Sequence, residues 1–146
     1  MPVRRFTDPS QPQTLQIAVF LLYINAVFSL FGLNDRSGIY AITTTSLIRS
    51  ISFDLANNIG QLLGLATIVA SLAGGYLIAN EKKLGYRLGI AATALPLVCY
   101  VVLLTIGYPH RYSLFELSLI NVAFAVARFA LLYHPESRNY QRLWFK

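Results

Sequence analysis

Four long apolar stretches alternate with short polar segments along the chain. Residues 9–34, 55–80 and 88–109 contain no Asp, Glu, Lys or Arg, and residues 113–133 are also mainly apolar. A helix rises about 1.5 Å per residue, so about 20 residues cross the ~30 Å hydrocarbon core of a membrane. The stretches lack the alternation of barrel strands, which leaves helices as the structure that satisfies the backbone in lipid. We therefore expect transmembrane helices at about 14–33, 58–79, 86–107 and 113–133.

The polar segment after the first span contains a shorter helical pattern. Between residues 46 and 55, four apolar residues fall on one helical face, while Arg49 and Asp54 fall elsewhere. We expect an amphipathic helix at 46–55 that lies in the interface of the outer leaflet, in the first extracytoplasmic loop. A re-entrant segment and a lid over the bundle are the alternatives.

The composition indicates a single membrane domain. The 146 residues are 55% hydrophobic and only 12% charged, whereas about 25% of the residues of a typical soluble domain are charged. Four spans leave too few residues for a separate soluble domain, so we expect one all-α integral membrane domain over 1–146, a four-helix transmembrane bundle. The first apolar run exceeds the ~7–15 residues of a signal-peptide core, which favours a retained span over a cleaved leader.

The Lys and Arg residues lie mainly on one expected side of the membrane. Of the twelve, only Arg36, Arg49 and Arg111 fall on the other side. The positive-inside rule then predicts an N-in/C-in protein of the plasma membrane, with both termini in the cytoplasm. The net charge of +6 does not indicate a nucleic-acid partner, because no basic stripe with interleaved aromatic residues occurs.

Small residues recur at four-residue spacing in the second and third spans. Such spacing lets helix backbones approach closely, which is how helices associate in lipid. Packing within the chain is the first interpretation, and an oligomer interface is the alternative. The candidate helix-packing residues are Gly60, Gly64, Ala66, Ala70, Gly74, Gly85 and Gly89.

A few polar side chains fall inside the expected spans, where hydrocarbon makes them costly unless they pair or line water. Asn25 and Asn121 both fall near mid-membrane, and a hydrogen bond between them is the simplest interpretation. A polar site for a solute is the alternative. Glu116, nearer the outer end of its span, could lie in surface water, pair with Arg111 or Arg49, or carry a proton or cation. The candidate intramembrane polar site comprises Asn25, Gln61, Ser71, Glu116 and Asn121.

Basic and aromatic residues gather around the expected cytoplasmic end of the last span. Arg128 lies about a turn and a half from that end, so we expect its side chain to extend to the lipid headgroups rather than to line a substrate site. The tail after the span combines arginines with aromatic residues, which favours a membrane-surface anchor over a docking peptide for a protein partner. The candidate headgroup contacts are Arg128, Arg138, Arg142 and Trp144.

The sequence contains no motif for a catalytic or cofactor site. Two haems in a four-helix bundle need about four axial ligands, but His110 and His134 lie at opposite expected faces and Met1 is the only methionine. HExxH, P-loop and GxSxG motifs are absent. We expect no enzyme activity, no cofactor and no metal site.

Two functional hypotheses follow. The leading one is a non-enzymatic multi-pass membrane protein that acts through helix packing, as an accessory, scaffold or assembly subunit. Its partners are the lipid bilayer and either further copies of itself or a larger membrane complex. The rival is a small-solute transporter or channel formed by an oligomer.

Overall fold

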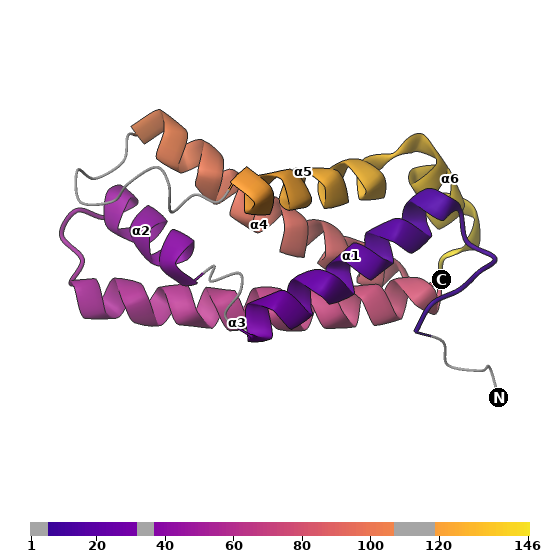
Figure 1. Ribbon diagram of the computed structural model, residues 1–146, viewed down its shortest axis with the longest axis horizontal. Helices are drawn as coiled ribbons and strands as arrows, with labels where there is room; N and C mark the ends of the chain where they lie inside the picture. The colour runs from indigo at the N-terminus through magenta and orange to yellow at the C-terminus, as the bar shows by residue number, and fades with distance from the viewer. Residues whose placement is uncertain (1–5, 32–36, 107–118) are drawn as a thin grey trace.

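The computed structural model describes residues 6–31, 37–106 and 119–146, which form helices and turns without strands. Within these residues, three helices are long and apolar enough to cross a membrane, which agrees with the prediction of a helical membrane protein. The fourth expected span is described only from Leu119, as part of a 15-residue apolar helix. The helices are α1 (Gln13–Leu30), α2 (Ser37–Leu47), α3 (Phe53–Ala79), α4 (Lys83–Ile106), α5 (Leu119–Tyr133) and α6 (Pro135–Trp144) (Figure 1).

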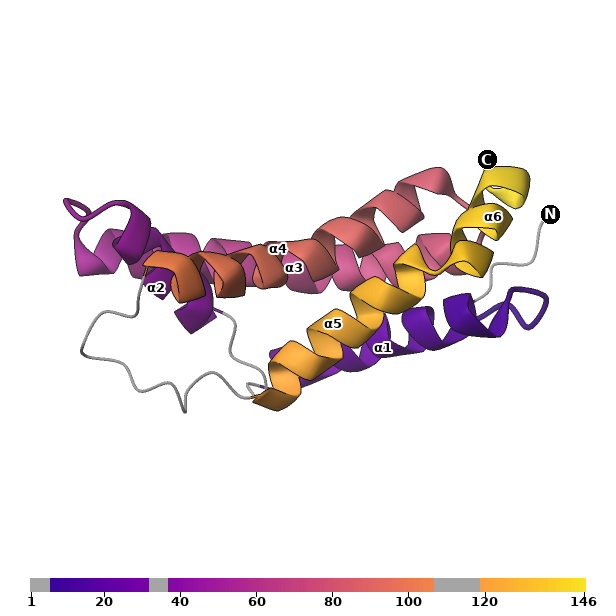
Figure 2. The ribbon, with the colours of Figure 1, turned by 90° about the horizontal axis from the view of Figure 1, so that it is seen from above.

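An antiparallel hairpin of α3 and α4 forms the frame of the bundle (Figures 1 and 2). The turn between them is tight because Glu81 adopts a left-handed backbone conformation (φ 56°). A Cβ atom added at Gly74 would lie 2.9 Å from the backbone nitrogen of Gly89, and one added at Gly85 would lie 2.6 Å from the backbone nitrogen of Ile78. The two backbones therefore meet at positions that only glycine can occupy without a shift.

Helices α1 and α2 lie one after the other along α3 (Figures 1 and 2). α1 covers the half of α3 near its C-terminal end, and α2 covers the half near its N-terminal end. The hydroxyl of Tyr40 in α2 lies 2.9 Å from that of Thr67, which is close to the middle of the 27-residue α3. The 18-residue α1 and the 11-residue α2 thus share the length that α3 covers alone.

The prediction of an interfacial helix at 46–55 is wrong. α2 ends at Leu47, residues 48–52 are not helical, and α3 already begins at Phe53. The side chain of Ser52 accepts a hydrogen bond from a backbone N–H in the first turn of α3 at 3.4 Å, and so caps that helix. The apolar residues of this segment therefore belong to two helices and to the turn between them.

α2 packs against α3 and α4 instead of lying apart from the bundle. Its residue Tyr40 is 1% exposed and belongs to a buried cluster with Tyr100 and Leu103 of α4. The hydroxyls of residues 43–46 each donate to the carbonyl four residues earlier, at 2.7–2.8 Å. Because these bonds satisfy the hydroxyls inside the helix, the polar sequence of α2 does not need water around it.

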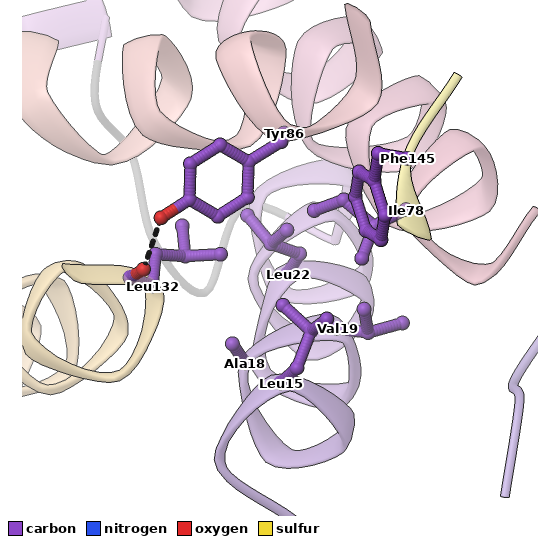
Figure 3. Close-up of a cluster of buried hydrophobic side chains, with 8 residues drawn as sticks. All are labelled: Leu15, Ala18, Val19, Leu22, Ile78, Tyr86, Leu132 and Phe145. Atoms are coloured by element: carbon purple, nitrogen blue, oxygen red, sulfur yellow. Dashed lines mark hydrogen bonds between the residues drawn. The ribbon is translucent and has the colours of Figure 1, made fainter. Parts of the chain in front are cut away.

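The two remaining helices close the other half of the bundle. α5 packs against α1 and α4, and α6 follows it at the end where α1 begins and where α3 turns into α4 (Figure 1). We call this the α6 end. A buried cluster fills the space there between all these helices, and its Tyr86 hydroxyl donates to the carbonyl of Leu132 (Figure 3). The cluster consists of Leu15, Ala18, Val19, Leu22, Ile78, Tyr86, Leu132 and Phe145.

Candidate functional site

The most polar part of the interior lies between α1, α3 and α5. Asn25 of α1 is 5% exposed, and its amide nitrogen donates to the hydroxyl oxygen of Ser71 in α3 at 3.3 Å. Ser71 is fully buried. Two helices that are far apart in sequence are thus joined by a hydrogen bond between buried side chains.

α3 makes a second polar contact one turn away. Thr67 and Ser71 are four residues apart and share a face of α3, so the hydroxyl of Thr67 meets Tyr40 of α2 while Ser71 meets Asn25 of α1. Tyr40 is not among the polar residues predicted from the sequence, although a tyrosine followed by a run of hydroxyl residues is a pattern that fits a buried helix with satisfied hydroxyls.

Arg128 of α5 lies inside the bundle. Its side chain is 1% exposed, and its Nε donates to the carbonyl of Phe124 at 3.2 Å, one turn toward the N-terminal end of α5. The prediction that Arg128 contacts the headgroups is wrong. Ala125, Arg128 and Leu132 share one face of α5, all of them buried, and side chains on a helix point toward its N-terminus. Because this face of α5 packs against the bundle, the guanidinium of Arg128 points into the interior.

A small pocket between α1 and α5 brings three of these polar side chains together. It has a cavity volume of about 20 Å³, which suffices for about one water molecule. A guanidinium in such surroundings is costly and is held there by the packing of its helix. The pocket is lined by Leu21, Ile24, Asn25, Phe28, Asn121, Phe124 and Arg128.

The four described residues of the predicted polar site do not come together as one site. Asn25 contacts Ser71, and Asn121 lines the same pocket as Asn25. Gln61 is exposed on the outside of α3, about 15 Å along the helix from Ser71 because the two are ten residues apart. Within this chain it therefore does not share a site with Asn25 and Ser71. Glu116 lies outside the described residues.

The seven predicted packing residues also fall into different environments. Gly74, Gly85 and Gly89 lie in the contact between α3 and α4. Gly60 is buried as well, whereas Gly64 and Ala70 are half-buried and Ala66 is exposed. The small residues near the C-terminal end of α3 thus serve contacts within the chain, and Ala66 is left on the outer surface.

The chain matches no protein-family model, no curated protein and no solved structure. The side chains of the site are therefore the basis for assigning its chemistry. In the described ranges, no group of three or more His, Cys, Asp or Glu residues is placed to hold a metal ion.

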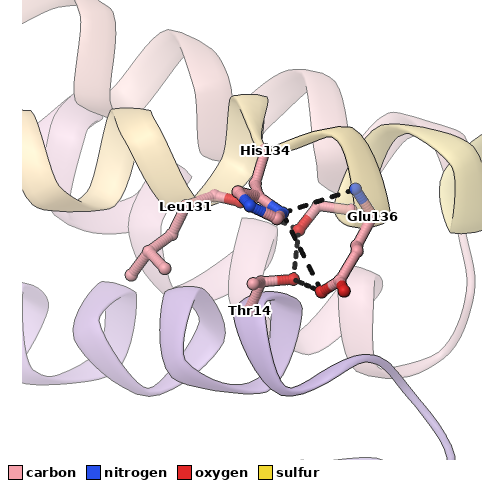
Figure 4. A network of polar contacts seen from close by, with 5 residues as sticks. Thr14, Leu131, His134 and Glu136 are labelled. Atoms are coloured by element: carbon pink, nitrogen blue, oxygen red, sulfur yellow. Dashed lines mark hydrogen bonds and ion pairs between the residues drawn. The ribbon is translucent and has the colours of Figure 1, made fainter.

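A second polar network lies at the junction of α5 and α6 (Figure 4). The hydroxyls of Thr14 and Ser137 are 3.0 Å apart, and Ser137 donates to the carbonyl of Leu131 at 2.8 Å. The backbone N–H of Glu136 donates to Nδ1 of His134 at 3.4 Å. These contacts cap α6 and attach it to α1, and they account for the positions of the His134 and Glu136 side chains.

The same end contains a half-buried phenol. Tyr140 of α6 donates to a carboxylate oxygen of Glu81 at 2.9 Å. Burial, together with this hydrogen bond to a carboxylate, raises the pKa of Tyr140 above its ordinary value. The neutral phenol is therefore the form that links α6 to the α3–α4 turn at physiological pH.

We expect the Asn25→Leu variant to be less stable than the wild type by roughly 0.5–2 kcal/mol, because it removes the side-chain bond that joins α1 to α3. Unfolding followed by circular dichroism in a mild detergent measures the loss. Gln61→Leu makes the same chemical change at an exposed position, and this control should retain the wild-type stability. Equal losses in the two variants would contradict the role of the Asn25 contact.

Proposed function

We propose that this chain is a non-enzymatic multi-pass membrane protein that acts through helix packing, as an accessory, scaffold or assembly subunit. In this proposal α1 and α2 together make the first crossing, α3 and α4 make the next two, and the span predicted at 113–133, which contains α5, makes the fourth. α1 begins and α6 ends at the same end of the bundle (Figure 1), which fits an even number of crossings. The distribution of Lys and Arg favours a cytoplasmic location for this end, in the plasma membrane.

The observation that supports this function is that interior polar side chains form hydrogen bonds between helices. Asn25 and Ser71 join α1 to α3, and Tyr40 and Thr67 join α2 to α3. The pocket at this level has a volume of about 20 Å³, whereas sites for organic ligands have about 300–1,000 Å³. Polar groups that are engaged between helices stabilise one arrangement of those helices, which is what an assembly subunit requires.

The outer faces of α3 and α4 supply the surface that such a subunit needs. Val69 of α3 is 63% exposed and Val101 of α4 is 59% exposed, and both lie among other exposed apolar residues. In a membrane these faces contact lipid or a protein helix. The proposal assigns at least one of them to a protein partner, either a second copy of this chain or another membrane subunit.

Photocrosslinking tests this assignment. A benzophenone amino acid at position 69 or 101 should give, in intact membranes, a protein adduct of one discrete mass and a fixed stoichiometry. The same probe at Leu103, which is fully buried, is the matched control on the same helix as Val101 and should crosslink only within the chain. Adducts with lipid alone at both exposed positions would contradict the assembly function.

Transport of a small inorganic ion is the second candidate function. The observation that favours it is the cationic side chain of Arg128 beside a water-sized pocket that Asn25 and Asn121 also line. Buried ionisable residues in membrane bundles often mark ion pathways. An ion flux in proteoliposomes that is lost in the folded Arg128→Gln variant would replace the assembly proposal with this one.

A further inference from the structure

Two basic segments from different parts of the sequence meet at the α6 end. The backbone N–H of Lys146 donates to the carbonyl of Glu81 at 2.9 Å, and the backbone N–H of Lys83 donates to the carbonyl of Lys146 at 3.1 Å. These two bonds attach the last residues of the chain to the α3–α4 turn. The arginines of α6 and the lysines of the turn are therefore brought to one end of the bundle (Figure 2).

Among the described residues at this end, exposed basic side chains outnumber exposed acidic side chains. Glu81 accepts a hydrogen bond from Tyr140, and Asp8 is 7% exposed. Glu136 is an exposed carboxylate at this end and lies 3.8 Å from Nδ1 of His134. The end consequently presents an excess of positive charge to its surroundings. We call the exposed set the basic end surface: Lys82, Lys83, Arg87, Arg138, Arg142 and Lys146.

Large apolar side chains are exposed at the same end. Leu143 and Trp144 are 80% and 58% exposed at the end of α6, and Leu84 is 60% exposed at the start of α4. Phe145, which follows Trp144, is buried in the core. It fixes the backbone there, while the side chains of Leu143 and Trp144 stay outside the core. Tryptophan prefers the boundary between headgroups and acyl chains, and Lys and Arg next to it meet the phosphates.

We propose that the basic end surface binds the phosphates of anionic phospholipids in the leaflet that contacts the α6 end. The chain supplies both parts that such a lipid needs, a cluster of cations for the headgroup and exposed Leu143 and Trp144 for the start of the acyl chains. Each cation near an anionic membrane surface strengthens binding by about fivefold. Arg128, buried in the bundle, is not part of this surface. The inference depends on a membrane location but not on the assembly function, so either can fail alone.

Native mass spectrometry of the full chain in neutral detergent tests the inference. Phosphatidylglycerol and phosphatidylcholine with the same acyl chains are added in equal amounts, and the bound fraction of each is measured. The wild type should retain phosphatidylglycerol severalfold better, and 0.5 M salt should reduce the difference because it screens exposed charges. Equal retention of the two lipids would overturn the proposal.

Matched variants identify the surface. Arg142→Gln should weaken retention of phosphatidylglycerol by about fivefold. Arg142→Lys, which keeps the positive charge, should retain most of the wild-type binding. Arg49→Gln removes one exposed arginine in the segment between α2 and α3, away from the α6 end, and should change retention by less than about twofold. Equal effects of the Arg49 and Arg142 variants would show a response to net charge alone and would overturn the assignment to this surface.

The acyl part of the proposal needs its own comparison. Trp144→Ala should lower retention of phosphatidylglycerol, and an excess of water-soluble glycerol phosphate should not displace the lipid. Displacement by glycerol phosphate would identify a site for free phosphate compounds and would contradict binding of a membrane lipid. Binding of an RNA oligonucleotide with the same dependence on Arg142 would contradict it as well.

Discussion

The Gly85→Ala variant should lose about 3 kcal/mol of stability or fail to fold. The added Cβ would lie 2.6 Å from the backbone nitrogen of Ile78 and in contact with Leu77 of the facing helix. A backbone atom cannot move aside as the end of a side chain can, so α3 and α4 must separate. Thermal unfolding in mild detergent, followed by circular dichroism, measures the change.

Other glycines provide the controls for this prediction. Gly38→Ala adds the same methyl group in α2 where nothing lies within 4 Å, and it should leave the stability equal or up to ~1 kcal/mol higher because alanine favours a helix. Gly89→Ala should cost less than Gly85→Ala, since its nearest neighbours are the ends of the Ile78 and Leu22 side chains. Equal losses at positions 38 and 85 would show that the α3–α4 contact is not the cause.

The sequence predicts the long helices well because their signal is intrinsic. A stretch such as 55–80 has no charged residue, and its length and apolarity indicate a membrane helix whatever its neighbours are. The signal of the polar turn between the second and third stretches is equally local, since charged residues directly follow one apolar stretch and directly precede the next. In both cases, the information is contained in consecutive residues.

α2 could not be predicted in this way because its environment is formed by other helices. The hydroxyls at 43–46 resemble a polar loop in a hydropathy pattern, but each bonds to its own helix. Tyr40 is buried only because Thr67 and α4 are beside it. The helix of this region therefore lies at Ser37–Leu47, before most of the predicted segment, and packs against α3 and α4.

Which polar side chains are buried could be predicted only in part, for a related reason. Asn25 and Ser71 lie on the packed faces of their helices, whereas Gln61 lies on an outer face and Arg128 on an inner one. Residue type indicates that a polar side chain in a span is unusual, but only the helix rotation decides whether it faces lipid or protein. For Arg128, the buried neighbours at Ala125 and Leu132 define that rotation, and their spacing was visible in the sequence.

In the tail, residue type likewise does not show which of two neighbouring aromatic side chains is buried. Trp144 and Phe145 both suggest a surface anchor from composition, yet Trp144 is 58% exposed and Phe145 only 3%. The Phe145 ring packs edge-to-face on Tyr86 and on Tyr140, with centroid distances of 6.3 and 6.1 Å. One aromatic residue of the tail is therefore part of the core, and it is the one that holds the end of the chain against the α3–α4 turn.

The Phe145→Ala variant should accordingly lose about 3–5 kcal/mol of stability, because it leaves a cavity in the cluster between α1, α4 and α5 and removes both ring contacts. Chemical unfolding in mild detergent measures the loss. Trp144→Ala, one residue away, should stay within about 0.5 kcal/mol of the wild type since that side chain is largely exposed. Because Phe145 also fixes the backbone of Lys146 beside the α3–α4 turn, its variant should further weaken retention of phosphatidylglycerol without removing any charge. A stable Phe145→Ala protein with wild-type lipid binding would mean that the tail does not dock on the bundle.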